Sequence, residues 1–384
     1  MRILVVNDLL QGGGVEKLMY DLVMRFHDEH EMTILTDKMD PEFADIYPEN
    51  VGYLYQMEKD YPKGRTKLER KLIARTRYKR ESALKAKIES MKFDVLLCMK
   101  ESWIMMMAMT YGSYIPKRIA WVHTDYTKSY YTRDWYGNEE NEVKFMQKFH
   151  HVICVSQMIL DSIKSVIGDP GNLLLRYNPL DANEIIEKSL EPVEDIKRTE
   201  KPLFVTVGRL NYQKGFDILL EVCNLLNQEG YQYELWIVGG GENWNNYQVQ
   251  HDLENQIFRY HLDNVFLLGH RKNPHKYVKQ ADWFLSSSRY EGFSFVSQEA
   301  AIIGKPLVLT ECAGVMELLK TRDNGIVMEN SFAGIYLGMK QALEHPEMAQ
   351  EYVKRMDIPD PYFYGEGRMK AIEELFTSDA MGGE

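Results

Sequence analysis

The sequence has few cysteines, and their spacing excludes two classes of cross-linked fold. The 384 residues include only Cys98, Cys154, Cys223 and Cys312, and no two of them form a Cys-x-x-Cys pair. No zinc cluster is indicated, because its ligands come in closely spaced pairs, and four cysteines spread over 384 residues do not indicate a disulfide framework. A chain of this length can bury large cores without cross-links. We therefore expect buried free thiols in a reducing compartment.

Long apolar runs are also lacking. Stretches such as Trp103–Met109 are far shorter than the ~18 residues that a membrane-spanning helix needs. The opening apolar run ends at Asn7 and Asp8, too early for the core of a signal peptide. We expect neither a membrane-spanning nor a secreted protein, and a cytoplasmic location.

A basic surface is absent from most of the chain. The net charge is -11, which argues against a nucleic-acid partner, since such proteins carry a basic footprint. Residues 61–90 are the exception, with eleven Lys and Arg against three Glu, a net of +8. These basic residues, which lie in or beside a predicted helix, are Lys63, Arg65, Lys67, Arg70, Lys71, Arg75, Arg77, Lys79, Arg80, Lys85 and Lys87. Two interpretations stay open: a solvated charged helix, or peripheral contact with an anionic inner membrane surface.

Short apolar runs alternate with amphipathic helices along nearly the whole chain. This alternation is typical of parallel sheets covered by helices on both faces. The predicted strands are Ile3–Asn7, Met32–Leu35, Phe93–Met99, Arg118–His123 and Val152–Ser156, then Phe204–Val207, Tyr233–Val238, Val265–Leu268, Trp283–Ser286, Pro306–Leu309 and Gly325–Met328. A polar stretch at Glu191–Lys201 separates the two series. The sequence thus predicts an α/β protein with doubly wound domains at 1–185 and 200–350. A last helix within 360–378 has a small apolar face, and the sequence permits it to pack back on the first domain.

Two glycine triplets follow predicted strands. A dinucleotide-binding fingerprint after the first would need glycine at position 17, which is Lys17, and the second fails likewise at Trp244. Both are therefore poor dinucleotide sites. Gly13 and Gly14 in the first triplet either form a flexible turn or bring backbone amides to a phosphate at the start of the next helix.

Charged residues follow two strands of the second domain. Arg209 and Lys214 come after Phe204–Val207; Glu291 comes after Trp283–Ser286. Glu299 lies in the next helix, which is expected to begin at Ser294, a good N-cap. Because the carboxyl ends of parallel strands meet at one edge, these groups should lie close together. Two cations beside two carboxylates suit a diphosphate flanked by hydroxylated rings. Taken singly, each is as well explained as a surface charge or a partner of a helix dipole.

In their order and spacing, these elements resemble the retaining GT-B-fold glycosyltransferases of family 4, the glycosyltransferase group 1 proteins. The resemblance covers most of the chain and is strongest in the second half. It is carried by Gly13-Gly14-Val15-Glu16, Val155-Ser156-Gln157, Asn178-Pro179-Leu180-Asp181, Val207-Gly208-Arg209 with Lys214-Gly215, Val238-Gly239-Gly240-Gly241, Gly269 with Asn273-Pro274, the Glu-x7-Glu element Glu291–Glu299, Gly304-Lys305-Pro306, and Gly314 with Glu317. It implies GT-B architecture, with two Rossmann-like domains facing across a cleft, the nucleotide-sugar on the second and the acceptor on the first.

The resemblance also assigns roles. It places Arg209 and Lys214 on the donor diphosphate and Glu299 on the ribose hydroxyls. Glu291 and the backbone around Gly292, Phe293 and Ser294 would position the donor sugar, with Gly13 and Gly14 close to the diphosphate. His123, at the end of its strand, matches a histidine near the reacting sugar, although a purely structural hydrogen bond explains it equally well.

The reaction implied is hexosyl transfer with retention of configuration from a nucleoside-diphosphate sugar, with UDP favoured. The acceptor is expected to be a saccharide or a lipid-linked saccharide, in cell-surface polysaccharide or glycolipid synthesis. No Asp-x-Asp occurs in the sequence, which agrees with a reaction that needs neither metal nor cofactor. The alternatives are a GT-B-fold nucleotide-sugar epimerase, a non-catalytic nucleotide-sugar-binding protein and an NAD-dependent oxidoreductase, the last disfavoured by the glycine spacing.

Overall fold

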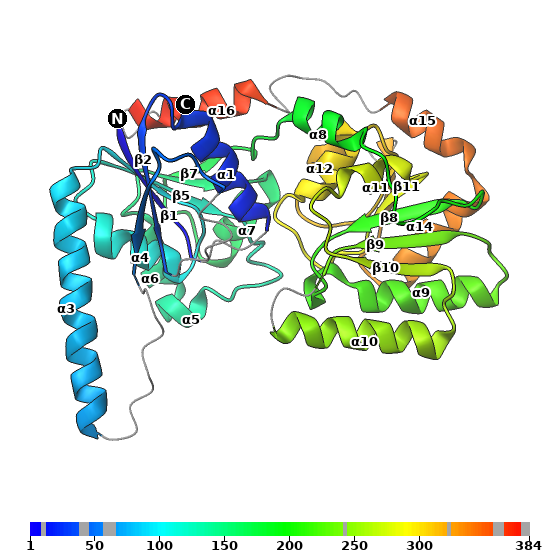
Figure 1. The fold of residues 1–384 in the computed structure, drawn as a ribbon, viewed down its shortest axis with the longest axis horizontal. Coiled ribbons are helices and arrows are strands. Elements are labelled where there is room, and N and C mark those ends of the chain that lie inside the picture. Colours follow the sequence, from blue (N-terminus) through cyan, green and yellow to red (C-terminus); the bar gives the residue numbers. More distant parts are fainter. Residues whose placement is uncertain are drawn as a thin grey trace. The chain divides into compact units, whose positions relative to one another are not determined.

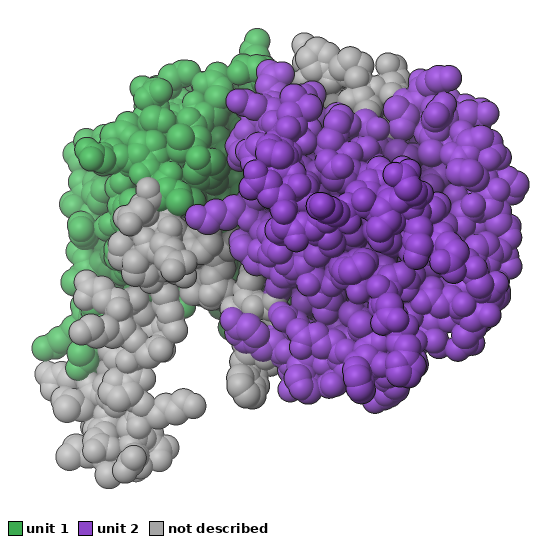
Figure 2. Space-filling model, turned by 45° about the vertical axis from the view of Figure 1, so that its right-hand side comes forward, with its two compact units in different colours: residues 1–155, 159–179, 366–384 green, residues 156–158, 180–365 purple. Residues whose placement is uncertain are grey.

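The computed structural model describes residues 1–8, 13–37, 46–56, 67–240, 244–320, 324–355 and 365–377, with backbone only for 67–75, 77 and 244–246. Its contacts divide the chain into two compact units. Unit 1 comprises residues 1–155, 159–179 and 366–384, and unit 2 comprises residues 156–158 and 180–365 (Figure 2). The expected domain limits, 1–185 and 200–350, stay predictions, and each unit is described by itself.

Unit 1 is built on a parallel sheet of seven described strands in the order β3-β2-β1-β4-β5-β6-β7 (Figure 1). The strands are β1 (Arg2–Val6), β2 (Glu31–Thr36), β3 (Gly52–Tyr55), β4 (Val95–Cys98), β5 (Lys117–Val122), β6 (His151–Cys154) and β7 (Leu173–Leu175). The helices are α1 (Gly14–Phe26), α3 (Lys67–Met91), α4 (Trp103–Gly112), α5 (Arg133–Tyr136), α6 (Glu139–Met146), α7 (Gln157–Val166) and α16 (Glu366–Thr377). The strand order reverses between β1 and β4, so the sheet is doubly wound, as the sequence predicts.

Unit 2 contains a second parallel sheet, with the described strands in the order β10-β9-β8-β11-β12-β13. The strands are β8 (Leu203–Val207), β9 (Glu234–Val238), β10 (Val265–Gly269), β11 (Trp283–Ser286), β12 (Leu307–Thr310) and β13 (Ile326–Met328). The helices are α8 (Ala182–Ser189), the 3-10 turn η1 (Tyr212–Lys214), α9 (Phe216–Gln228), α10 (Trp244–Tyr260), α11 (His275–Gln280), α12 (Phe295–Ile302), α13 (Val315–Leu319), α14 (Phe332–Glu344) and α15 (Glu347–Arg355). Helices α9, α10 and α14 pack together in one layer, and α8, α11 and α12 in another. The switch point falls between β8 and β11.

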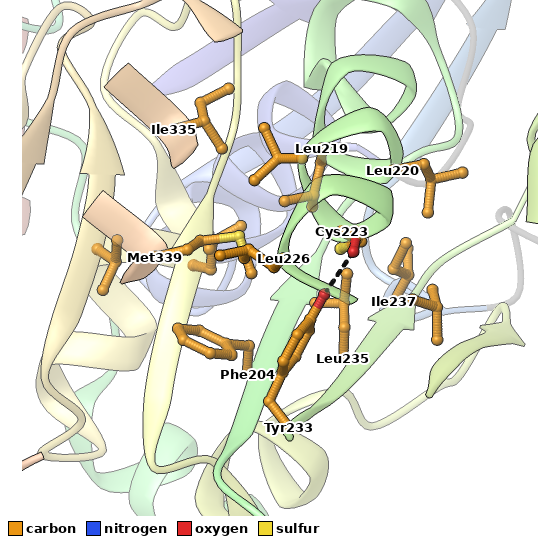
Figure 3. Packing of buried hydrophobic residues seen from close by; sticks show 14 of the residues in the cluster. Phe204, Leu219, Leu220, Cys223, Leu226, Tyr233, Leu235, Ile237, Ile335 and Met339 are labelled. Carbon is orange, nitrogen blue, oxygen red and sulfur yellow. Dashed lines mark hydrogen bonds between the residues drawn. The ribbon is translucent and has the colours of Figure 1, made fainter. Parts of the chain in front are cut away.

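The core of unit 2 lies between α9, the sheet and α14. Figure 3 shows Leu219 and Leu226 of α9 in one cluster with Phe204 of β8 and Met339 of α14, and all four side chains are fully buried. Tyr233 closes this layer by donating its hydroxyl proton to the carbonyl of Cys223 at 3.2 Å. All four cysteines of the chain are free and buried, which confirms the expectation of buried thiols.

The last described helix, α16, belongs to unit 1 although it follows unit 2 in the chain. Its buried side chains include Ile372 and Phe376, and the Phe376 ring meets Phe26 of α1 edge-on at 5.3 Å. Arg368 donates a hydrogen bond to the carbonyl of Asn178, near the end of the segment 159–179 of unit 1. The helix therefore covers part of the α1 side of this unit.

Two strands of unit 1 were not expected from the sequence. Both β3 and β7 are edge strands with mostly half-buried side chains, and β7 has three residues. Edge strands this short present little apolar pattern, because one side of each meets solvent rather than a neighbouring strand.

Candidate functional site

The charged residues of unit 2 gather at the carboxyl edge of its sheet. Arg209 and Lys214 lie between β8 and α9, and Glu291 lies between β11 and α12. Since β8 and β11 are neighbours on the two sides of the switch point, their loops flank the crevice in which ligands of doubly wound sheets bind. The position agrees with the one expected from the sequence.

Lys214 and Glu291 form an ion pair within this edge. The ammonium Nζ of Lys214 lies 2.7 Å from Oε1 of Glu291, and the side chains are 16% and 11% exposed. Ser288 donates its hydroxyl proton to the same oxygen at 2.7 Å. Two donors thus fix the carboxylate, while the ammonium keeps two of its three protons, since no other acceptor for it occurs among the described residues.

Arg209 is the exposed cation of the same loop. Within the described ranges, no carboxylate, carbonyl or hydroxyl accepts a hydrogen bond from its guanidinium group. A planar fork of donors left in solvent beside Lys214 is suited to binding an anionic group in a bidentate manner.

Hydrogen bonds between the two loops hold this geometry. Ser287 donates its hydroxyl proton to the carbonyl of Lys214 at 2.8 Å, and Gln213 donates through Nε2 to the carbonyl of Tyr290 at 3.0 Å. The Arg289 guanidinium bridges to both carboxylate oxygens of Asp217, at 2.8 and 2.7 Å. Burial opposes ionisation of Asp217, but the hydrogen bonds and charge of Arg289 outweigh it and lower the pKa of this carboxyl.

A second layer fixes the Glu291 loop from β12 and β13. The carbonyl of Ser288 accepts hydrogen bonds from Thr310 Oγ1 at 2.7 Å and from Cys312 Sγ at 3.0 Å. Asn330 donates to the carbonyl of Arg289 at 2.7 Å. Because both carbonyls accept hydrogen bonds from side chains that follow or end neighbouring strands, the loop that carries Glu291 is held in place.

Glu299 lies away from the loop, in α12, and is buried. Its Oε2 is 3.3 Å from Nε2 of His275, a residue at the start of α11. Ser294 is the N-cap of α12, as expected from the sequence, and its hydroxyl accepts a hydrogen bond from the amide of Ser297. Phe293 is buried against Gly314, whose φ of 80° only glycine adopts easily.

Gly13, Gly14 and His123 belong to unit 1. Gly13 is the N-cap of α1. Because glycine has no side chain, it cannot accept a hydrogen bond from the first amides of this helix. Gly14 is the first residue of the helix. This geometry is compatible with an anion at the helix start and equally with a plain strand-to-helix turn.

His123 follows β5 and is held by buried polar groups. Its Nε2 lies 3.0 Å from the carbonyl of Met99, so this nitrogen carries the proton, and its amide donates to Glu101 at 3.1 Å. Burial lowers the pKa of His123, although the charge of Glu101 opposes the shift. Glu101 is 1% exposed and also accepts from Thr124 Oγ1 and from Tyr131 OH. Burial likewise opposes ionisation of Glu101, but the His123 ring and the Thr124 hydroxyl lower its pKa.

The structure thus brings Lys214 and Glu291 into contact and places Arg209 in the same loop, whereas Glu299 contacts His275. Reasoning from the sequence missed Ser288, Asp217, His275 and Glu101, which hold the charged groups in place. Their local sequence carries no motif, and only the serine run Ser286-Ser287-Ser288 after a strand could have drawn attention.

Comparison with known proteins identifies the family. The family model described as "Glycosyl transferases group 1" matches residues 188–356, and that described as "Glycosyltransferase Family 4" matches residues 12–184. A glycosyltransferase of Haemophilus influenzae, itself uncharacterized, is 24% identical over 301 residues, 76% of this chain and 77% of its own. The chain belongs to glycosyltransferase family 4, the group 1 proteins, and is an enzyme of the glycosyltransferase class with a GT-B fold.

Other relatives are more distant or match over shorter spans. The N-acetylgalactosamine-N,N'-diacetylbacillosaminyl-diphospho-undecaprenol 4-alpha-N-acetylgalactosaminyltransferase of Campylobacter jejuni is 28% identical over 195 residues, 50% of each chain. The match to a relative from Methanocaldococcus jannaschii spans 35% of that protein's length. Among solved structures, Anabaena HepE in complex with UDP and glucose superposes with a TM-score of 0.76 at 17% identity, over 98% of this chain and 100% of that one. That likeness establishes the fold.

Two further observations concern metal-ligand clusters and membrane-spanning helices. No group of three or more His, Cys, Asp or Glu in the described ranges could hold a metal ion. None of the helices in the described part of the chain is long and apolar enough to cross a membrane.

Proposed function

We propose that this protein transfers a hexosyl group, with retention of configuration, from a nucleoside-diphosphate sugar to a saccharide or a lipid-linked saccharide. UDP is the favoured nucleotide. The observation that carries the proposal is the Lys214–Glu291 pair beside the exposed Arg209, at the switch point of unit 2. Two cations with free donors suit the diphosphate, and a fixed carboxylate suits sugar hydroxyls.

Each proposed residue has one task. Arg209 and Lys214 bind the diphosphate and stabilise the negative charge that develops as it leaves. Glu291, with the backbone of Gly292, Phe293 and Ser294, positions the donor sugar, and Glu299 binds the ribose hydroxyls. On unit 1, Gly13 and Gly14 contribute amides to the diphosphate, and His123 contacts the reacting sugar.

The reaction exchanges one bond at the anomeric carbon. The acceptor oxygen bonds to this carbon on the face from which the phosphate oxygen departs. The acceptor proton passes to an oxygen of the leaving diphosphate, so no side chain acts as nucleophile and no metal takes part. Glu291 is fixed by Ser288 and Lys214, which suits a hydrogen-bond acceptor for hydroxyls.

Two relatives support the choice of substrates. The name of the Campylobacter jejuni relative specifies an α linkage and a diphospho-undecaprenol-linked saccharide, and the HepE structure contains UDP and glucose. We extend both to this chain as a UDP-sugar donor and a lipid-linked or polysaccharide acceptor, in cell-surface polysaccharide or glycolipid synthesis.

Calorimetry of the whole chain with UDP, GDP, ADP and NAD, in EDTA, tests the donor site. We expect one nucleoside diphosphate to bind. Arg209→Ala should lower the affinity for it about tenfold or more, because charge-assisted hydrogen bonds are lost. Arg259→Ala, an exposed arginine of α10, is the matched control and should bind normally. Binding of NAD alone, or a need for a divalent metal, would contradict the proposal.

Two rival functions predict different products. A nucleotide-sugar epimerase would isomerise its sugar nucleotide without an acceptor, and a non-catalytic binding protein would release no product at all. NMR of the product's anomeric proton distinguishes all three and also tests retention: the proposal requires a glycoside with the anomeric configuration of the donor.

We also propose that α3 contacts an anionic membrane surface, with the protein on the inner, cytoplasmic face. Figure 1 shows α3 as one long helix that extends beyond the sheet of unit 1. Lys79, Lys85 and Lys87 are exposed on it, each worth about 1 kcal/mol near anionic lipid. Lys63 and Arg65 lie outside the described residues, as do the side chains of Lys67, Arg70, Lys71, Arg75 and Arg77.

Vesicle sedimentation tests this contact. Binding to vesicles with phosphatidylglycerol should be lost at high salt, on pure phosphatidylcholine, and in the double variant Lys79→Glu with Lys85→Glu. The same charge reversal at two exposed lysines of unit 2, Lys197→Glu with Lys201→Glu, should leave binding unchanged. Salt-insensitive binding, or none, would remove the idea.

A further inference from the structure

An exposed tryptophan, Trp135, and a half-buried one, Trp103, form a pair on unit 1. Trp103 is the first residue of α4, just after β4, and Trp135 lies in α5, after β5. Because β4 and β5 are parallel neighbours, both side chains stand beyond the same carboxyl edge of the sheet, where α/β proteins bind ligands. Their ring centroids are 6.5 Å apart with planes tilted by 42°, and Trp135 is 50% exposed.

Among the tryptophans whose side chains the structure describes, the exposure of Trp135 stands apart. Trp121, Trp236 and Trp283 are fully buried, as the largest apolar side chains normally are. An indole left half in water forgoes the stabilisation that burial provides, so this pair on a fixed support indicates a binding surface.

Two tyrosine hydrogen bonds, one buried and one partly buried, hold the two tryptophan segments together. Tyr131 donates to Oε1 of the buried Glu101 at 2.9 Å, and Tyr136 donates to the carbonyl of Ser102 at 2.8 Å. These tyrosines flank Trp135, and Glu101 and Ser102 directly precede Trp103. The pair is therefore fixed before any ligand arrives, and preorganisation of this kind reduces the entropy lost on binding.

The backbone at Ser102 adds a second observation. Its φ and ψ are 77° and -142°, a conformation that residues with a side chain rarely adopt. Such strain persists only where surrounding contacts impose it, and it concentrates at binding and catalytic sites. Here it sets the direction in which α4 begins, and with it the position of Trp103.

The charges beside Trp135 restrict the chemical class of ligand that this pair could bind. Asp134 precedes it and Glu139 begins α6, against the cation Arg133, while the next carboxylate, Glu140, is paired with Lys144. Acidic groups repel an anionic lipid surface and a phosphate, but they accept hydrogen bonds from neutral hydroxyls. An indole face flanked by such acceptors suits a pyranose ring, which has an apolar C–H face and a hydroxyl rim.

We propose that Trp103 and Trp135 form a stacking subsite for a pyranose ring of the acceptor saccharide. This inference rests on the proposed function, since it assigns the acceptor to unit 1. The apolar face of the ring packs on the indoles, and its hydroxyls donate to the neighbouring carboxylates. Glu101 is a positioning residue that acts through Tyr131.

Fluorine NMR of the whole chain labelled with 5-fluorotryptophan tests the subsite. The probes are the methyl glycosides of glucose, galactose, mannose, N-acetylglucosamine and N-acetylgalactosamine, titrated at millimolar concentration. We expect at least one to shift the Trp103 and Trp135 resonances saturably while those of Trp121, Trp236 and Trp283 stay in place. Trp103→Phe and Trp135→Phe assign the two signals.

Trp135→Ala should weaken the binding of that glycoside about tenfold, because it removes the stacking face. Trp135→Phe should recover part of the lost affinity. Tyr78→Ala, which removes another exposed aromatic of unit 1, should have no effect. Absence of any shift, shifts spread over all tryptophans, shifts caused by phosphatidylglycerol vesicles instead, or conversion of a dimer to a monomer by Trp135→Ala would each overturn the subsite. UDP binding, measured in parallel, separates this failure from failure of the donor site.

Discussion

At the residue scale, the ion pair of Lys214 and Glu291 is the most sharply defined feature of the candidate site. The expectation from the sequence was that two cations and two carboxylates would meet at one sheet edge. Lys214 and Glu291 do meet, whereas Glu299 lies against His275. Sequence order could place these residues near one edge, but the pairing depends on side-chain directions that only the packed loops define. Their roles in donor binding stay predictions.

A double-mutant cycle on this pair should show coupling. Lys214→Met or Glu291→Gln alone should lower the free energy of unfolding by about 2 kcal/mol, because each leaves a mostly buried partner unpaired. The double variant should lose less than the sum, with a coupling energy of about 1–3 kcal/mol. Urea unfolding of the unmodified chain, the two single variants and the double variant gives the four free energies of unfolding. Additivity of the two losses would show that the pair does not form in solution.

At the scale of elements, the loops after β8 and β11 act as one unit. Gly215 links η1 to α9 with a φ of 65°, and a Cβ there would lie 2.2 Å from the carbonyl oxygen of Ser287. The close approach lets Ser287 reach the carbonyl of Lys214 and so aligns the two loops. In the sequence Gly215 appears only within the Lys214-Gly215 element, and its contact with a residue 72 positions later could not be predicted from it.

Gly215→Ala should therefore disrupt the donor site as well as the fold. We expect a larger loss of unfolding free energy than for Gly230→Ala, and much weaker nucleotide binding, because the loops must separate to admit the methyl group. Gly230 is the matched control, since it also has a positive φ, 86°, but open space around its Cβ position. That variant should show only the backbone cost of about 1 kcal/mol. Equal losses for the two alanines would contradict the close approach.

At the scale of the whole molecule, the chain returns to unit 1 after completing unit 2. The helix α16 buries Phe376, 4% exposed, against Phe26 of α1. The sequence predicted the helix and permitted this packing. The sequence could not determine which surface the helix packs on, because a small apolar face can be covered by any surface of matching shape.

Phe376→Ala should loosen unit 1 selectively. The loss of a buried aromatic ring costs about 3–5 kcal/mol, so hydrogen exchange of the α1 amides should become faster, while β8 to β12 keep their protection. Phe258→Ala, at an 80% exposed phenylalanine of α10, is the control and should change neither unit. Faster exchange in unit 2 after Phe376→Ala, or unchanged exchange in α1, would argue against the packing of α16 on α1.

The sequence by itself determined the two doubly wound domains, the positions of their main strands along the chain and the strand ends that carry the charged residues. It could do so because buried parallel strands and amphipathic helices leave strong local patterns, and because strand order fixes which loops share an edge. Tertiary structure alone decided the edge strands β3 and β7, the pairing of Lys214 with Glu291, the buried support of His123 and the meeting of Trp103 with Trp135. Each of these depends on contacts between residues distant in sequence, whose geometry is set by packing rather than by any local pattern.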